Sequence, residues 1–168
     1  RLVSYKHVDH LIREFQKVTE VIPKAELHIV GSGPCEKELR LLARSLRVRS
    51  VFHGFVSEKK KIKIIKSSDV LVNPSSVEGL GLILLESMMC GTAVIAKELD
   101  CYFFCTKRNS VLYKNDVELH REIVRLLAQP TLRRKLVLRG KKTASRFTWD
   151  SVANNVERLY ESVVCRRT

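Results

Sequence analysis

Short apolar segments alternate with helical patterns along most of this chain, and this alternation constrains the fold more than any other feature. Apolar residues at helical spacing mark the helices, and short apolar runs bounded by turn residues mark the strands. The pattern predicts helices over residues 7–20, 39–46, 62–65, 82–90, 117–129, 131–147 and 149–164, and strands over residues 25–30, 51–53, 70–73, 93–96 and 110–113. Strands that alternate with helices form parallel sheets covered on both faces. We therefore expect an α/β fold, a Rossmann-like doubly wound parallel sheet with additional C-terminal helices.

Local signals mark several helix ends. Gly91 follows the apolar helix over residues 82–90 and is suited to cap its end. Pro130 lies where two helices join, at a position where its missing N–H would have no partner. Asp150 and Ser151 are both suited to cap the start of the last helix, and the sequence leaves this choice open.

The length of 168 residues fits one domain, residues 1–168, that can bury a proper core. No apolar run approaches the about 20 residues of a membrane-spanning helix, and no secretory signal opens the sequence, so we expect a cytoplasmic protein. The five cysteines are odd in number and scattered, which argues against a disulfide framework. His7 and His10 stand three residues apart on the first helix, and we interpret them as surface histidines, with a metal site as the alternative.

The formal net charge of +13 makes nucleic acid, an anionic membrane and phosphorylated ligands candidate partners. Lys and Arg are concentrated in residues 37–66 and 133–146. Few aromatic residues are interleaved with them and no nucleic-acid-binding motif accompanies them, so the sequence argues against nucleic acid. Peripheral contact of the basic faces with an anionic membrane remains open, beside the simpler interpretation of a solvated helix face.

Ligands of doubly wound sheets bind beyond the carboxyl ends of the strands, so the loops at those ends matter most. The Gly-Ser-Gly-Pro loop of residues 31–34 follows a strand and precedes a helix. Gly31 and Gly33 would let backbone approach a ligand closely, and a helix N-terminus favours an anion. The loop lacks the third glycine of the dinucleotide fingerprint and the lysine of a P-loop. A tight turn without a ligand explains it equally well.

Residues 73–93 form the richest stretch of the chain, with a strand, a Pro/Ser turn and then two glycines that open an apolar helix. Glycines beside the first helical turn leave backbone N–H groups accessible, which suits a diphosphate. Glu78 stands at the loop, and Glu86 lies about two turns further on, where we expect it among buried neighbours. A buried carboxylate needs donors or a positive charge, and sugar hydroxyls would supply donors. Alternatively, Glu78 caps the helix and Glu86 bonds locally.

Residues 74–94 carry the pattern Pro-Ser-x-x-Glu-Gly-x-Gly, a second Glu after seven intervening residues, and Cys-Gly-Thr-x-Val. This arrangement strongly resembles the C-terminal domain of retaining glycosyltransferases of family 4, which have the GT-B fold. The resemblance extends along the whole chain in the same order. Further matches are the Arg-(four residues)-Lys segment at 1–6, the Gly-x-Gly-Pro loop at 31–34, the strand and turn at 52–57, the strand at 68–75, and the aromatic-Thr-Trp element at 147–149.

The resemblance implies a role for particular residues. Arg1 and Lys6 would pair with the diphosphate of a nucleotide-sugar donor and Glu78 would bond the sugar hydroxyls, which makes these three the implied catalytic groups. Glu86 would hold the ribose hydroxyls, and main chain near Val56 would contact the base. The implied donor-binding set is Gly31, Gly33, Val56, Glu78, Gly79, Leu80, Gly81, Leu82 and Glu86, with the N–H groups of residues 79–82 meeting the sugar and phosphates. The donor would be a UDP- or GDP-sugar, transferred with retention, and no metal or other cofactor would be required.

Departures from the family pattern are also informative. Leu80 replaces a usual Phe and Lys97 a usual Ser, while bulky residues 99–105 replace a glycine-rich turn that faces the sugar. The N-terminal domain of a GT-B enzyme, which binds the acceptor, is absent from the chain, so we expect the donor-binding half of an enzyme that is inactive by itself. The alternative is a non-catalytic basic module of the same fold that contacts a membrane surface or a protein partner.

Overall fold

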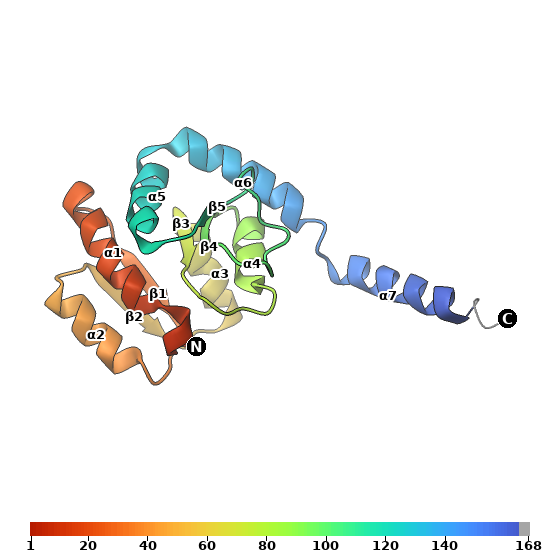
Figure 1. Cartoon of the computed structure of the whole chain (residues 1–168), viewed down its shortest axis with the longest axis horizontal. Coiled ribbons are helices and arrows are strands. Elements are labelled where there is room, and N and C mark those ends of the chain that lie inside the picture. Colours follow the sequence, from red (N-terminus) through yellow and green to blue (C-terminus); the bar gives the residue numbers. More distant parts are fainter. Residues whose placement is uncertain (165–168) are drawn as a thin grey trace.

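The structure is a computed structural model that describes residues 1–164 (Figure 1). For Asp116 it describes the backbone alone. The helical elements are η1 (Ser4–Lys6), α1 (Val8–Val21), α2 (Glu36–Ser45), α3 (Glu58–Ser67), α4 (Leu82–Cys90), α5 (Asp116–Ala128), α6 (Pro130–Ala144) and α7 (Trp149–Val164). The strands are β1 (Leu27–Val30), β2 (Ser50–Gly54), β3 (Val70–Asn73), β4 (Ala93–Lys97) and β5 (Val111–Tyr113). The predicted order of strands and helices is confirmed, although α2 and α3 are longer than expected and β1 and α6 are shorter.

All strand pairs are parallel, as the alternation of strands and helices predicted. β1 pairs with β2, and β4 lies between β3 and β5. The strands form two hydrogen-bonded sheets, β1-β2 and β3-β4-β5, rather than one continuous sheet. Figure 1 shows α1 and α2 beside the first sheet and α3 to α6 around the second. The α/β class is confirmed, and the sheet is divided between β1 and β3.

The cores follow from the apolar faces of the helices. α1 buries Leu11, Ile12, Phe15 and Val18 on one face, which packs with the apolar side of α5 in the larger core. In the second core, α4 packs against the middle strand β4 and the loop that carries Tyr102. Because β4 is covered on both faces, the side chains of its first four residues are all buried.

Helix α4 has the bounds that the sequence predicts, and both its ends are set by glycine. Gly81 precedes the helix with φ 76°, and Gly91 follows it with φ 84°. These left-handed conformations cost little without a Cβ atom. The N–H of Gly91 donates to Met88 O at the end of the helix, so the predicted cap is confirmed.

Helix α7 extends away from the body of the molecule (Figure 1). It has no buried residue, and Trp149, Leu159 and Tyr160 are among its exposed apolar side chains. The hydroxyl of Thr148 accepts a hydrogen bond from the Ser151 N–H at 3.2 Å, so Thr148 caps this helix. The helix has the predicted bounds, Trp149–Val164, so the expectation of a cap at Asp150 or Ser151 was wrong because both residues lie inside its first turn. Within residues 1–164, no helix combines the length and apolar character needed to span a bilayer.

Candidate functional site

The glycine loop holds the N-terminal segment in place. The N–H of Leu2 donates to Ser32 O at 2.9 Å, and the N–H of Cys35 donates to Leu2 O at 3.3 Å. A Cβ atom on Gly33 would lie 2.3 Å from Leu2 O, which is shorter than real contacts allow. Gly33 is therefore required for the close approach of two backbone segments, and this contact places Arg1 beside the loop.

Lys6 and Glu78 meet although they are far apart in the sequence. Lys6 is the last residue of the short helix η1, and its Nζ donates to Glu78 Oε1 at 2.6 Å. The Glu78 side chain is 15% exposed. Burial tends to raise the pKa of Glu78, but hydrogen bonds from Lys6, Asn73 and Ser75 and the charge of Lys6 outweigh burial and hold the pKa below its ordinary value. Glu78 is therefore a carboxylate at neutral pH, held against a cation.

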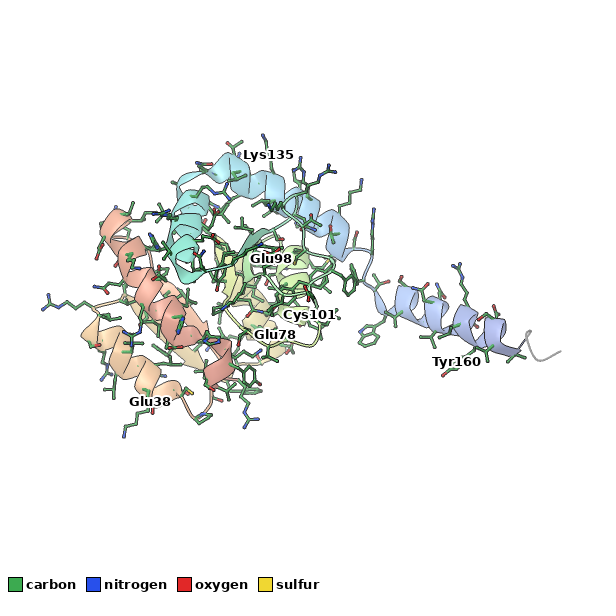
Figure 2. The ribbon with its side chains drawn as sticks, viewed as in Figure 1. Glu38, Glu78, Glu98, Cys101, Lys135 and Tyr160 are labelled. Atoms are coloured by element: carbon green, nitrogen blue, oxygen red, sulfur yellow. The ribbon has the colours of Figure 1, made fainter. Side chains whose placement is uncertain are left out.

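Glu78 does not cap α4, because Gly81 occupies the cap position without a side-chain hydrogen bond. Asn73, at the end of β3, instead joins Glu78 to the bulky loop. Its Nδ2 donates to Glu78 Oε1 at 3.2 Å and to the Tyr102 hydroxyl at 3.1 Å. The sequence did not identify Asn73 or Tyr102 as site residues, although Asn73 ends a strand at the predicted ligand edge. Figure 2 shows Glu78 near the centre of the molecule, close to the loop that carries Cys101.

Tyr102 also occupies the space behind Gly81. A Cβ atom on Gly81 would lie 2.4 Å from Tyr102 Cε1, and the Tyr102 residue is 2% exposed. Burial, followed by the charge of Glu78, raises the pKa of Tyr102 above its ordinary value. The hydroxyl therefore stays protonated at neutral pH. The bulky loop of residues 99–105 thus forms a wall behind the first residues of α4.

Glu86 is paired with a lysine that the sequence analysis missed. Lys61 Nζ, from α3, lies 2.7 Å from Glu86 Oε2 and 2.8 Å from Glu58 Oε2. Burial lowers the pKa of Lys61, but the two carboxylates outweigh it and raise the pKa above its ordinary value. The expectation of local bonding at Glu86 was wrong because this contact comes from another helix.

Burial at Glu86 is also more limited than expected, since its side chain is 39% exposed. Its Oε2 atom is nevertheless buried and has no hydrogen-bond partner among the described residues. The contact between Lys61 Nζ and Glu86 Oε2 is therefore an ion pair that lacks the angles of a hydrogen bond. A buried carboxylate oxygen in this state can still accept a hydrogen bond from a ligand hydroxyl.

A cleft of about 730 Å³ opens where the two sheets face one another. Residues of β1 and β3 line its sides, and charged side chains stand with Phe55 and Val56 among the residues that line it. Of the predicted site residues, the cleft brings together Arg1, Lys6, Gly31, Val56 and Glu78, and it adds Glu58 and Lys61. Gly33, Gly79, Leu80, Gly81, Leu82 and Glu86 do not line it. Glu86 is connected to it through Lys61.

A parallel α/β domain with fixed cations and carboxylates at the carboxyl edge of its strands belongs to the doubly wound, ligand-binding class. Comparison with known proteins narrows this class. Residues 1–143 match the family described as glycosyl transferases group 1, and the chain belongs to this family. Its α/β architecture is that of the GT-B glycosyltransferases.

Individual relatives agree with this assignment. The chain is 30% identical over 162 residues to a phosphatidyl-myo-inositol mannosyltransferase of Mycobacterium tuberculosis, covering 91% of this chain and 43% of that protein. Sucrose-phosphate synthase of Thermosynechococcus elongatus superposes with a TM-score of 0.84 at 26% identity, over 98% of this chain and 44% of that one. TarM of S. aureus, solved with UDP, superposes with a TM-score of 0.86 at 19% identity, over 95% of this chain and 34% of that one. The chain therefore spans less than half the length of these relatives.

Proposed function

We propose that this chain is the donor-binding part of a retaining glycosyltransferase and that it binds a UDP- or GDP-sugar in the cleft between the two sheets. The observation that carries the proposal is the pair of carboxylates in the family spacing, each held against its own lysine: Glu78 by Lys6 and Glu86 by Lys61. A nucleotide sugar presents a diphosphate for cations and two sets of hydroxyls for carboxylates, so its chemistry matches this set. The relative solved with UDP supports the nucleotide part.

The donor's parts can be assigned to the cleft and to helix α4 and its preceding loop beside it. Arg1 and Lys6 bind the diphosphate, and the N–H groups of residues 79–82 contact the phosphates and the sugar. Glu78 accepts hydrogen bonds from the sugar, Glu86 accepts them from the ribose, and the main chain near Val56 contacts the base. Lys61 pairs with Glu86 and orients its carboxylate. Gly31 and Gly33 contribute by fixing the backbone that carries Arg1.

Catalysis follows from charge stabilisation. When the bond between the anomeric carbon of the sugar and the diphosphate breaks, negative charge develops on the departing nucleoside diphosphate. Fixed cations and the N-terminus of α4 stabilise this charge without the need for a metal. The sugar is transferred to the acceptor with retention at the anomeric carbon.

The remaining parts of the active enzyme lie outside this chain. Its relatives are more than twice as long, and we assign acceptor binding to an N-terminal domain of that additional length. The exposed apolar side chains of α7 suit contact with such a domain. The basic faces suit peripheral contact with an anionic membrane, and the mannosyltransferase relative is named for a lipid acceptor.

The proposal predicts that nucleoside diphosphates stabilise the folded chain. A ligand that binds only the folded state adds about 2.7 kcal/mol at a hundredfold excess over its dissociation constant, which is roughly 5–11 °C in Tm for a chain of this size. A thermal-shift panel of UDP, GDP, ADP and their sugars measures this and also identifies the base. A non-catalytic module would give no shift with any of them at millimolar concentration, and that result would contradict the proposal.

A second prediction concerns metal ions. Because Arg1 and Lys6 supply the positive charge for the diphosphate, we expect donor binding measured by calorimetry to be unchanged when EDTA is added. Loss of nucleotide binding with chelator, and its recovery with Mg²⁺ or Mn²⁺, would show that the assignment of the diphosphate to these cations is wrong.

A further inference from the structure

The start of α1 carries three side chains of types that ligate transition metals. His7 is the residue before the helix, and Asp9 and His10 lie in its first turn. One potential ligand atom from each of the three lies within 4.8 Å of the other two. The rings of His7 and His10 stand edge to face with centroids 5.1 Å apart, and His10 Nε2 lies 3.6 Å from Asp9 Oδ2. The cap residue and the third residue of a helix are neighbours in space, which explains why the two rings meet.

Ser76, from another segment of the chain, contacts the His7 ring. The Ser76 hydroxyl oxygen lies 2.8 Å from His7 Nε2 and 3.3 Å from Tyr5 O, to which the hydroxyl can donate its hydrogen. When the hydroxyl donates to Tyr5 O, its oxygen accepts the Nε2 hydrogen of His7, and Nδ1 is the nitrogen that can bind an ion. Metal-ligating histidines commonly donate their other ring N–H to a neighbour in this way, which orients the ring.

The backbone at His7 is unusual in a way that fits a functional role. Its φ of 48° is left-handed, and among the described residues only Arg47 shares this feature without being glycine. A side chain in this region is strained relative to the ordinary conformation. Such outliers gather at functional sites, where the surrounding structure holds them in place. Here the left-handed turn brings the His7 ring toward Ser76 on one side and His10 on the other.

Two imidazoles and one carboxylate suit a borderline ion such as Zn²⁺. Ligand atoms around a tetrahedral Zn²⁺ ion lie about 3.3 Å apart. The three ligand atoms here lie within 4.8 Å of one another, so each distance between them must shorten by roughly 1.5 Å at most. The side chains of Asp9 and His10 are 45% and 43% exposed, which gives them room to rotate and leaves a path for an ion and its waters. The positive end of the helix dipole repels a cation, and the Asp9 carboxylate opposes that effect.

We propose that His7, Asp9 and His10 form a binding site for a Zn²⁺-class transition-metal ion at the start of α1, next to the donor cleft and separate from it. Lys6, which binds Glu78, immediately precedes His7, and Ser76 lies two residues before Glu78. An ion on His7 therefore anchors both segments that carry the Lys6–Glu78 pair. The site does not depend on the donor assignment, because none of its three ligands belongs to the donor-binding set.

Binding is tested on the full chain of 168 residues with Zn²⁺ for affinity and Ni²⁺ for position. In calorimetry, we expect one Zn²⁺ site whose affinity falls in the Asp9→Asn and His10→Gln variants. Loss of a residue that hydrogen-bonds to a metal ligand lowers metal affinity roughly 10–100-fold, and loss of a ligand itself should lower it at least as much. Paramagnetic Ni²⁺ should broaden the ring signals of His7 and His10 in two-dimensional NMR before those of other histidines. Equal Zn²⁺ affinity in wild type and both variants would overturn the proposal.

Matched variants separate this site from other ligands in the chain. His28 Nδ1 and His53 Nε2 are also close, at 2.9 Å, so His28→Gln is the control and should leave Zn²⁺ affinity unchanged. The free cysteines could bind Zn²⁺ as thiolates. Zn²⁺ binding that persists in His10→Gln but disappears after cysteine alkylation would assign the metal to thiols and overturn the proposal. Ser76→Ala should weaken binding if the hydroxyl orients His7. The EDTA-treated variants should keep the wild-type Tm, because Asp9 and His10 are half-exposed.

Discussion

Replacing Gly33 by alanine should destabilise the protein and displace Arg1. The added methyl group would lie 2.3 Å from O, 2.7 Å from N and 2.8 Å from C of Leu2, and none of these backbone atoms can move independently. The N-terminal segment would have to leave the loop, which breaks its two hydrogen bonds and exposes the buried Leu2 side chain. Overpacking of this kind typically costs about 1–3 kcal/mol. We expect Tm to fall by roughly 2–12 °C in differential scanning calorimetry.

Gly79→Ala is the matched control for this substitution. A Cβ atom on Gly79 would meet nothing within 4 Å, and its backbone is not left-handed. Its stability should therefore change by no more than about 0.5 kcal/mol. If the two alanine variants unfold at the same temperature, the loop does not hold the N-terminal segment as described. Gly33→Ala should additionally weaken nucleoside diphosphate binding, because Arg1 is attached to the displaced segment.

Changing each of the two glutamates of the family motif to glutamine should weaken binding of a different set of ligands. Glu86→Gln should weaken both the free nucleotide and the nucleotide sugar, because the ribose belongs to both ligands. Glu78→Gln should weaken only the nucleotide sugar. A hydrogen bond to a charged group contributes roughly 1.5–3 kcal/mol, so each loss amounts to about ten- to a hundredfold in affinity. Calorimetry on the chain itself measures these differences without an acceptor.

The Lys6–Glu78 ion pair affects how free nucleotide should bind. Lys6 Nζ is bound to Glu78 Oε1, and a diphosphate must compete with that carboxylate for the lysine. Glu78→Gln removes the competing charge, so free nucleotide should bind as well as before or slightly better. Glu38→Gln, on the outer helix α2, is the control and should leave both ligands unaffected (Figure 2). Equal losses for both ligands in both variants would show that the two carboxylates do not have separate roles.

Features with local causes could be predicted from the sequence. The bounds of α4 and β3 are correct because a glycine or proline stands at or next to their ends. The parallel arrangement is also correct, because it follows from the order of strands and helices. The bounds of α7 are also correct, but its cap was misassigned, because Thr148, Asp150 and Ser151 are all competent caps and local sequence does not rank them.

Features that depend on contacts between distant segments could not be predicted in this way. Lys61 was read as part of a basic helix, and its pairing with Glu86 appears only when α3 and α4 pack together. Tyr102 was seen as a bulky replacement in the loop, but its contact with Asn73 depends on how that loop folds over β3. The separation of β1 from β3 likewise has no sequence signal, since both segments are ordinary apolar strands. Family spacing identified Glu78 and Glu86, whereas packing identified their partners.

The 2.6 Å contact between Lys6 and Glu78 has a consequence for competition among cellular anions. Lys6 and Glu78 already neutralise each other, so a simple anion gains little by taking the lysine. Inorganic phosphate would take Lys6 from Glu78 and leave a largely buried carboxylate without its cation, which is costly. On the proposed assignment, a nucleotide sugar replaces both halves of the pair, with phosphate oxygens for the lysine and hydroxyls for the glutamate. The proposal therefore implies selectivity against abundant small phosphates, achieved by internal neutralisation rather than by exclusion on size.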